Sequence, residues 1–375
     1  MTANFHDQIK APTLLLDKNR AQANLRRMAA KAAAQKVRFR PHFKTHQSAE
    51  IGEWFRAEGV TAITVSSMRM AAYFAAHGWE DILVAFPVNL REIEEIRTLS
   101  EQVHLGLLVE SPESVERLAA DLPQSVDIWL KIDSGMHRAG LDVRDSNAVL
   151  ELTNEVLAHK NFTLRGLLTH AGQTYHAHSP EEICQMYAAS VGAMNALRGE
   201  LQGDLGVKLE VSVGDTPGCT LCDDLGSVDE VRPGNFIFFD AMMHDLGVCA
   251  WEEVAVVVAC PVVALHPARS EAVIYGGSIH LSKEMLEADG QGFYGYAAFP
   301  TARGWQPTDA HSRIISLSQE HGVVRLTAQD LERLNVGDLL YILPVHSCLV
   351  VEALKNYRCL NGTRIDTLNS CHLVD

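Results

Sequence analysis

Short runs of β-branched and apolar residues alternate with amphipathic helical patterns along the first part of the chain. Eight runs have the composition of buried strands: Val37–Arg40, Thr61–Val65, Ile82–Ala85, His104–Val109, Val126–Ile132, Leu164–Leu168, Lys208–Val213 and Phe236–Phe239. Helices are predicted between them, among them Ser48–Arg56, Met68–Ala76, Leu90–Leu99, Pro112–Ala120 and Pro180–Leu197. This alternation is typical of an α/β protein with a (β/α)8 TIM barrel, for which about 250 residues is usual.

The pattern changes after Leu246. Long helical patterns largely disappear, and strand-like segments punctuated by Gly and Pro follow: Glu253–Ala264, Ala272–Tyr275, Gly322–Leu326 and Asp338–Ile342. Such segments favour a compact, mainly antiparallel β-domain. Leu14–Leu16, near the start, is also strand-like and lies outside the eight. We therefore predict a barrel over residues 12–245 and a β-domain over residues 246–375 together with residues 1–11.

The composition is that of a soluble globular protein. Of the 375 residues, 47% are hydrophobic and 21% charged, and the formal net charge is −15. This negative charge argues against nucleic acid or an anionic membrane surface as a partner. The start is polar, and the longest apolar stretch, Val254–Leu265, contains Pro261 and is too short to span a bilayer. We expect a cytoplasmic protein whose eight cysteines are reduced.

Lys44 lies in a loop where a barrel would present its chemistry. In a TIM barrel the loop after each strand opens on the active-site face. The loop after the first predicted strand is Arg40–His46, in which Lys44 lies between His42 and His46. A lysine amine must be neutral to attack a carbonyl, and desolvation or nearby cations favour the neutral form. Lys44 is therefore a candidate for attaching an aldehyde cofactor, and a solvated loop lysine is the alternative.

Three further loops carry groups that suit an anion. The Gly-rich turn after the fifth predicted strand can aim Arg138 at a negative group. Val213–Gly218, after the seventh, offers backbone N–H groups and the Thr216 hydroxyl to a phosphate. Val231–Asn235, just before the eighth, adds the cation of Arg232. These loops suit a phosphorylated aromatic aldehyde, and no GxGxxG or Walker loop opens a helix here.

These segments resemble a known family. Pro41–His46, Lys131–Arg138 and Val231–Gly234 are similar to motifs of the alanine-racemase-like, fold-type III pyridoxal-phosphate (PLP) enzymes. The branch that they resemble more closely contains D-serine dehydratase and D-threonine aldolase. The resemblance extends from Pro12 to the C-terminus. It implies that Lys44 carries PLP as a Schiff base and that the protein is a homodimer.

The resemblance also implies roles around the cofactor. The residues that would hold its phosphate are Thr216, Gly234 and Asn235. Tyr175 would contact the cofactor, and Arg138 would lie beside its ring hydroxyl or the substrate. Arg232 matches the racemase arginine that faces the pyridine nitrogen. A salt bridge that supports the last barrel strand is the alternative for Arg232.

A second signal lies near the end of the chain, in Leu343–Cys348. On a strand, positions i and i+2 point to the same face, so His346 and Cys348 could share one metal ion. Imidazole and thiolate suit zinc, and two protein ligands leave positions open for water or substrate. Taken alone, a His-x-Cys pair is a weak signal, and a place in the core or at the surface is favoured over a metal site. In the family resembled, His-x-Cys implies zinc in the dehydratases, whereas the aldolases carry His-x-Asp with a harder metal.

The resemblance implies a D-serine dehydratase-like lyase that converts a D-β-hydroxy amino acid to a 2-oxo acid and ammonia. Lys44 would remove the Cα proton, and the zinc would assist departure of the β-hydroxyl. The alternatives are retro-aldol cleavage to glycine and an aldehyde, dehydration of D-threonine or 3-hydroxyaspartate, a racemase, and a non-catalytic PLP-homeostasis protein. Cys219 and Cys222 are expected to pack in the core, and no role is assigned to Gly276–Ser282, Tyr294 or Tyr296.

Overall fold

The computed structural model describes residues 5–370. Its contacts divide the chain into two compact units. The barrel unit comprises residues 26–44 and 51–236, and the sheet unit comprises residues 1–25, 45–50 and 237–375. The chain therefore passes between the units after residues 25, 44, 50 and 236. Among the described residues, no helix is long and apolar enough to cross a membrane.

The barrel unit is a closed parallel barrel, as predicted. Its strands are β2 (Arg38–Phe39), β3 (Ala62–Val65), β4 (Asp81–Pro87), β5 (His104–Val109), β6 (Val126–Asp133), β8 (Phe162–Thr169), β9 (Glu210–Val213) and β10 (Glu230–Val231). They pair in the order β2-β10-β9-β8-β6-β5-β4-β3. A bridge between His42 and Thr64 joins the segment after β2 to β3 and closes the circle. The short β7 (Leu141–Asp142) pairs only with β6.

The eighth strand is not where the sequence predicted it. It is β10, Glu230–Val231, whereas Phe236–Phe239 begins within a 3-10 turn, Asn235–Ile237, and is buried without forming a strand. Pro233 lacks an N–H group and cannot continue the ladder, so β10 ends after two residues. The Arg232–Asn235 segment consequently follows the eighth strand. It therefore lies at the carboxyl end of that strand, like the other candidate loops.

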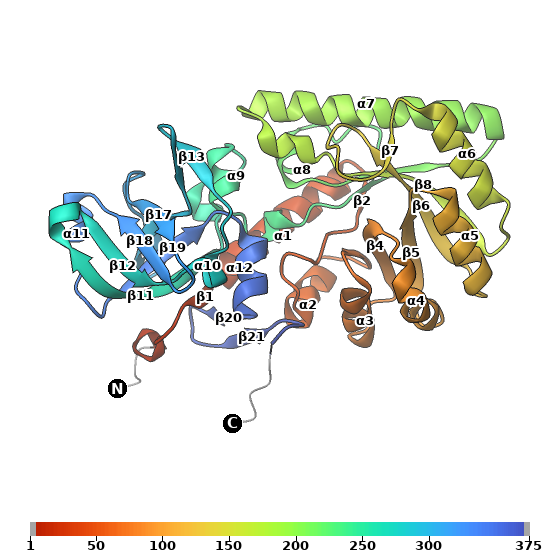
Figure 1. Ribbon diagram of the computed structural model, residues 1–375. Coiled ribbons are helices and arrows are strands. Elements are labelled where there is room, and N and C mark those ends of the chain that lie inside the picture. Colours follow the sequence, from red (N-terminus) through yellow and green to blue (C-terminus); the bar gives the residue numbers. More distant parts are fainter. Residues whose placement is uncertain (1–4, 371–375) are drawn as a thin grey trace. The chain divides into compact units, whose positions relative to one another are not determined.

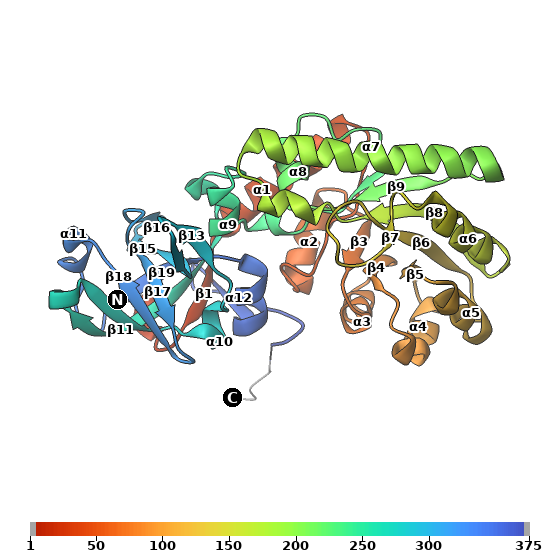
Figure 2. The same cartoon turned by 45° about the horizontal axis from the view of Figure 1, so that its top comes forward.

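The helices of the barrel unit lie outside its strands (Figure 1). They are α2 (Ala49–Ala57), α3 (Met68–Ala76), α4 (Ile93–Ser100), α5 (Pro112–Asp121), α6 (Ser146–Leu157) and α7 (Pro180–Leu205), with α2 beginning in the sheet unit. Side-chain caps explain where several begin: Ser111 and Ser179 accept hydrogen bonds from the first turns of α5 and α7. Figure 2 shows the length of α7, which ends at Gly206 in a left-handed conformation. The chain also forms α1 (Lys18–Ala34), which, like α6, was not predicted.

The sheet unit is built on a mainly antiparallel sheet, as predicted. Its strands are β1 (Thr13–Leu16), β11 (Val256–His266), β12 (Glu271–Tyr275), β15 (Gly295–Thr301), β16 (Gly304–Pro307), β17 (Arg313–Leu317), β18 (His321–Arg325), β19 (Leu339–Pro344), β20 (Asn356–Cys359) and β21 (Arg364–Asp366). The order is β12-β18-β17-β15-β19-β11-β1-β20-β21, with β16 beside β15. The early strand β1 thus lies between β11 and β20. Its residues Leu14–Leu16 are completely buried.

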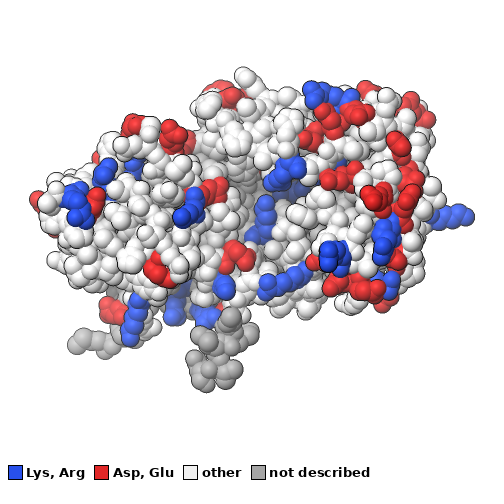
Figure 3. Space-filling model, viewed as in Figure 1, with Lys and Arg blue, Asp and Glu red and all other residues white. Residues whose placement is uncertain are grey.

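Arginines, carboxylates and His104 form a closed ring around the barrel, and most of them lie at or near the amino ends of its strands. The members, in order around the circuit, are Arg38, Glu230, Arg40, Asp81, His104, Asp127, Arg165 and Glu210. Successive members are 2.5–3.6 Å apart. The ring includes β2 and β10, which share only two ladder positions. Ion pairs therefore support closure where backbone pairing is shortest. On the outer surface, acidic and basic side chains are intermixed (Figure 3).

Candidate active site

Cations gather at the carboxyl ends of the barrel strands. Lys44 lies beyond β2, Arg138 beyond β6 and Arg232 beyond β10. Their common neighbour is His170, whose pKa falls to about 3 because of burial and then the charges of Lys44, Arg138 and Arg232. The structure therefore brings together three residues predicted from separate loops. Three cations in one place suit an anionic ligand.

Lys44 itself is exposed, although the residues on both sides of it are completely buried. Phe43 packs against Phe55, Phe74 and Trp79 in the barrel unit, with ring centroids 4.8–5.0 Å apart. The backbone N–H of Lys44 donates to Nδ1 of His42 at 3.3 Å. The lysine is thus held on a firmly packed backbone while its side chain remains accessible.

Lys131 is a further cation of the site that the sequence analysis left without a role. It lies on β6, is buried, and donates from Nζ to the carbonyl of Ile132 at 3.0 Å. Burial, followed by the charges of Arg232 and Arg138, lowers the pKa of Lys131 to about 8. Its position near the end of a predicted strand was the available signal. The alternation of inward- and outward-facing residues along a strand does not show which charged residue is buried in the folded protein.

His170 is fixed in one orientation and was also left without a role. It follows Thr169, the last residue of β8, and its Nδ1 donates to the carbonyl of Gly214. Because a carbonyl only accepts, Nδ1 must carry the proton, and Nε2 of the neutral ring is left as an acceptor. The lowered pKa keeps the ring neutral near pH 7. This neutral ring adds no further positive charge between the cations.

Thr216 begins a short helix, α8 (Thr216–Leu221), at the carboxyl end of β9. Asp215 caps this helix by accepting from the Gly218 N–H at 2.6 Å and from the Thr174 hydroxyl at 3.0 Å. The Thr216 N–H donates to the hydroxyl of Tyr175 at 3.3 Å. Oγ1 of Thr216 is buried without a hydrogen-bond partner among the described residues. A buried hydroxyl without a partner indicates a position where a ligand oxygen would bind.

Arg232 is buried and bonded to two strands of the barrel. Its Nε donates to Oγ of Ser212 at 2.7 Å, and its Nη2 donates to the carbonyl of Thr169 at 2.5 Å. A Cβ at Gly214 would lie 3.2 Å from the guanidinium, so this glycine allows the arginine to approach the backbone. Burial lowers the pKa of Arg232 to about 10, although Glu230 opposes the shift. Gly234 and Asn235 follow after Pro233 and are buried.

The turn that carries Arg138 is shaped by Asp133, the last residue of β6. Oδ1 of Asp133 accepts from the N–H groups of Gly135 at 2.9 Å and of His137 at 3.1 Å. These bonds outweigh partial burial and lower the pKa of Asp133. Gln173 donates to the carbonyl of Ser134 at 3.2 Å and fixes the other side of the turn. Arg138 therefore projects, exposed, from a turn that local hydrogen bonds define.

The sequence analysis placed His346 and Cys348 on a strand, but in the sheet unit they lie at the start of a helix. β19 ends at Pro344, and α12 (Ser347–Leu354) follows with His346 as its first flanking residue. Asp240 accepts from the Ser347 N–H at 2.8 Å and stabilises this turn. The argument that positions i and i+2 of a strand share a face therefore does not apply. The two side chains are close because both lie at the start of α12.

The imidazole and the thiol are nevertheless neighbours. Burial would lower the pKa of His346, but Cys348 outweighs it and raises the pKa to about 10. Nδ1 of His346 is buried without a hydrogen-bond partner among the described residues and lies 3.9 Å from Glu284. No group of three or more His, Cys, Asp or Glu side chains arranged for a metal occurs within residues 5–370. The pair therefore offers one nitrogen and one sulfur donor.

The sequence analysis expected all cysteines to be reduced, and the structure contradicts this expectation. Cys184 on α7 forms a disulfide with Cys222, the residue after α8, and their Cα atoms are 5.3 Å apart. They are 38 residues apart in the sequence, so only the fold reveals that they are neighbours. Cys219 is buried and free. The disulfide joins α8, which begins with Thr216, to the long helix α7.

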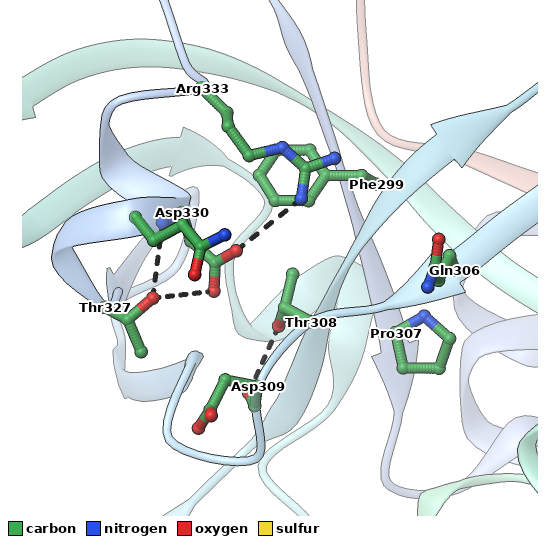
Figure 4. Close-up of a pocket in the computed structure, with 9 residues that line it drawn as sticks. Phe299, Gln306, Pro307, Thr308, Asp309, Thr327, Asp330 and Arg333 are labelled. Atoms are coloured by element: carbon green, nitrogen blue, oxygen red, sulfur yellow. Dashed lines mark hydrogen bonds and ion pairs between the residues drawn. The ribbon is translucent and has the colours of Figure 1, made fainter.

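One cavity of the sheet unit lies among residues that were not predicted (Figure 4). It has a volume of about 290 Å³ and is lined by Phe299, Gln306, Pro307, Thr308, Asp309, Thr327, Gln329, Asp330 and Arg333. Asp330 accepts from the hydroxyls of Ser312 at 2.6 Å and Thr327 at 3.0 Å. Arg333 covers the Phe299 ring at 3.7 Å. These groups are partnered with one another, so we assign the cavity no chemistry.

The segments that were left without a role also have internal partners. His280 lies on α10 (Ser278–Leu281), and its Nδ1 accepts from the Gly277 N–H at 3.2 Å. The hydroxyl of Tyr296 donates to Asp245 at 2.9 Å. These contacts are structural and do not by themselves indicate a ligand.

Two protein families match the chain. "Alanine racemase, N-terminal domain" matches residues 16–242, and "Putative serine dehydratase domain" matches residues 255–360. The D-threo-3-hydroxyaspartate dehydratase of Delftia sp. (strain HT23) is 31% identical over 94% of this chain and 94% of its own length. Its solved structure has a TM-score of 0.88 to this chain, at 28% identity, and covers 97% of this chain and 99% of that chain.

Other relatives include two reaction types. The D-serine dehydratase of Dictyostelium discoideum is 28% identical over 95% of this chain and 94% of its own length. The D-threonine aldolase of Arthrobacter sp is 25% identical over 90% of this chain and 86% of its own length. A variant of a D-threo-3-hydroxyaspartate dehydratase has been solved in a metal-free form, with a TM-score of 0.88 to this chain at 28% identity.

Proposed function

We propose, on the premise that this chain is a PLP-dependent lyase belonging to the alanine-racemase-like, fold-type III family, that it removes water from a D-β-hydroxy amino acid. The products would be a 2-oxo acid and ammonia. The observation that carries the proposal is the gathering of Lys44, Arg138 and Arg232 around the neutral His170. The similarity to dehydratases along almost the whole chain supports it.

The barrel unit fits PLP. Oγ1 of Thr216, buried and without a partner, suits a phosphate oxygen, and the cations suit the phosphate charge. In this proposal Lys44 binds PLP covalently and Tyr175 contacts it. The residues assigned to its phosphate are Thr216, Gly234 and Asn235, and those assigned to its ring or the substrate are Arg138 and Arg232. Bound PLP supplies an electron sink for the substrate's α-carbon.

The chain's own residues then handle charge and protons. Arg138 and Lys131 attract the substrate carboxylate, because both contribute positive charge to the same site. Nζ of Lys44 would be the acceptor of the Cα proton. The lysine lies on a packed backbone, so it stays within reach of the carbon. Neutral His170 keeps Nε2 as an acceptor beside these groups.

His346 and Cys348 would hold a zinc ion in this proposal. The unpartnered Nδ1 of His346 and the adjacent thiol of Cys348 form a donor set that suits zinc more than a hard cation. Zinc held there would supply Lewis-acid chemistry. The thiolate donor favours dehydration over retro-aldol cleavage, which remains the alternative.

A dicarboxylate substrate is a second candidate beside D-serine. The site holds Lys131 in addition to Lys44, Arg138 and Arg232, and this excess of cations can balance a second carboxylate. The relative of this chain from Delftia is named as a dehydratase of D-threo-3-hydroxyaspartate, which is a dicarboxylate. We therefore expect D-threo-3-hydroxyaspartate to be a substrate as well as D-serine.

The test is release of 2-oxo acid from PLP-loaded protein given D-serine or D-threo-3-hydroxyaspartate, with and without a chelator. Chelator-sensitive release of pyruvate or oxaloacetate supports the dehydratase and its metal. Glycine together with an aldehyde would replace the dehydratase with the aldolase. Interconversion of D- and L-serine would point to a racemase. Bound PLP without turnover of either substrate would contradict an enzymatic role on both.

We also propose a cytoplasmic homodimer. Large apolar side chains remain exposed in the sheet unit: Ile279 (49%), Met285 (51%) and Leu349 (40%). Exposed apolar groups of this kind are often covered by a second chain. Light scattering of the holoenzyme should give twice the mass of 41.2 kDa, and a monomeric mass would exclude the dimer.

A further inference from the structure

Thr45 lies directly after Lys44 but belongs to the sheet unit, within the segment 45–50. Its side chain is completely buried. Oγ1 of Thr45 lies 3.2 Å from Sγ of Cys348, within hydrogen-bond distance for sulfur. The residue that follows the candidate cofactor lysine therefore contacts the candidate metal thiol.

The backbone of this segment is fixed from several sides within the sheet unit. The Tyr357 hydroxyl donates to the carbonyl of His46 at 2.7 Å. The side-chain amide of Gln47 donates to Glu352 on α12 at 2.9 Å. The backbone carbonyl of Gln47 accepts from the Leu368 N–H at 2.8 Å. The helix α12 also carries Cys348. The Gln47–Glu352 hydrogen bond therefore ties the segment that contains Thr45 to the helix that contains Cys348.

The direction of this hydrogen bond follows from chemistry. A cysteine binds metal as a thiolate, which has no proton to donate and can only accept. The hydroxyl of Thr45 must then be the donor. A donated hydrogen bond orients the sulfur and stabilises its negative charge. Groups that orient metal ligands in this way contribute strongly to metal affinity.

We propose that Thr45 is a positioning residue of the metal site, whose hydroxyl holds the Cys348 thiolate ready to bind the ion. The inference rests on the metal site of the proposed function. Because Thr45 is joined covalently to Lys44, the same contact anchors the backbone next to the cofactor lysine.

The test uses Co²⁺ as a spectroscopic probe in the full-length, PLP-loaded protein. A thiolate bound to Co²⁺ gives a charge-transfer absorption band, and Cys348→Ala should abolish that band. Thr45→Val removes the hydroxyl but keeps the side-chain shape. We expect it to weaken binding of Co²⁺ and Zn²⁺ by about 10- to 100-fold and to shift the band. Thr45→Ser keeps the hydroxyl and should bind as the wild type does.

Thr308→Val is the matched control. Thr308 also lies in the sheet unit, and its hydroxyl donates to the carbonyl of Ala297 at 2.8 Å. This substitution should leave metal affinity unchanged. Wild-type affinity and an unshifted band in Thr45→Val would overturn the role of Thr45 while leaving the metal site intact. Absence of Co²⁺ and Zn²⁺ binding in the wild type would instead overturn both the metal site and the inference. If Thr45→Val misfolds, as judged by circular dichroism, the band and affinity of Thr45→Ser and Thr45→Ala decide.

Discussion

At the scale of single residues, Lys44 is the side chain on which the proposed chemistry most depends. Lys44→Ala should abolish the visible absorbance of lysine-bound PLP and reduce turnover to background, because no other amine would take its place. Reduction with borohydride, followed by peptide mapping, should label Lys44 in the wild type. Lys131→Ala serves as a comparison, since Lys131 is also in the site but buried. A label on Lys131 would show that the wrong lysine was chosen.

Cys348 separates metal binding from cofactor binding. Cys348→Ala should lose zinc and elimination but keep the absorbance of lysine-bound PLP, because its sulfur is one of only two proposed protein donors. Metal analysis and the visible spectrum measure the two effects independently. Cys260→Ala is a matched control, since Cys260 is a buried free cysteine of the sheet unit. Full elimination activity in Cys348→Ala would contradict the metal role.

Sequence could identify candidate residues but not their surroundings. Lys44, Arg138 and Arg232 were found because each stands beside a predicted strand end, where barrels place chemistry. The lowered pKa of Lys131 depends on neighbours from other strands, so no local pattern announces it. The disulfide likewise joins Cys184 and Cys222 across 38 residues. The roles proposed for the cofactor-contacting residues stay predictions.

At the scale of elements, the ring of ion pairs should make the barrel sensitive to acid. Burial alone would raise the pKa of Glu230, but Arg40 and Arg38 outweigh it and lower the pKa from 4.5 to about 2. Because its pKa is lowered, the ionised carboxylate of Glu230 stabilises the fold at pH above 4.5. This stabilisation is lost as the pH falls towards 2 and the carboxylate is protonated. Denaturant unfolding monitored across this window should show stability falling with pH.

The variant Glu230→Gln tests whether Glu230 causes this sensitivity to acid. It should cost about 3–5 kcal/mol near neutral pH, because it leaves buried Arg40 without its full partner. The variant should also lose less stability than the wild type between pH 4.5 and 2, since Glu230 no longer titrates. Glu94→Gln is the control, because Glu94 is 71% exposed and its pair with Arg97 contributes little. Parallel acid profiles for wild type and Glu230→Gln would refute the explanation.

Elements with a clear pattern were predicted to the residue. His104–Val109 and Met68–Ala76 coincide with β5 and α3, since apolar runs and helical periodicity mark them. The eighth strand was misplaced because the apolar run Phe236–Phe239 looks more strand-like than the two-residue β10. The charged Glu230 in β10 bonds to arginines from another strand. The burial of Glu230 therefore depends on arginines that are far from it in the sequence.

At the scale of the whole molecule, the sheet unit is assembled from three separate stretches of chain. A fragment of residues 246–375 should therefore not fold cooperatively, because β1 is missing between β11 and β20. Urea unfolding followed by circular dichroism measures this. Fusing residues 5–17 to the end of the fragment should restore at least part of the transition. A sharp transition in the fragment alone would show that β1 is dispensable. The predicted boundary near residue 245 stays a prediction.

The position of β1 also has a consequence for synthesis on the ribosome. Leu14–Leu16 leave the ribosome about 240 residues before their partners Val256–Val258, and Arg358 follows later still. At translation speeds of about 5–20 residues per second, the three leucines wait many seconds without a strand beside them. An apolar segment exposed for that long is a ready substrate for chaperones. Nascent-chain crosslinking at Leu15 should capture a chaperone until β11 has emerged.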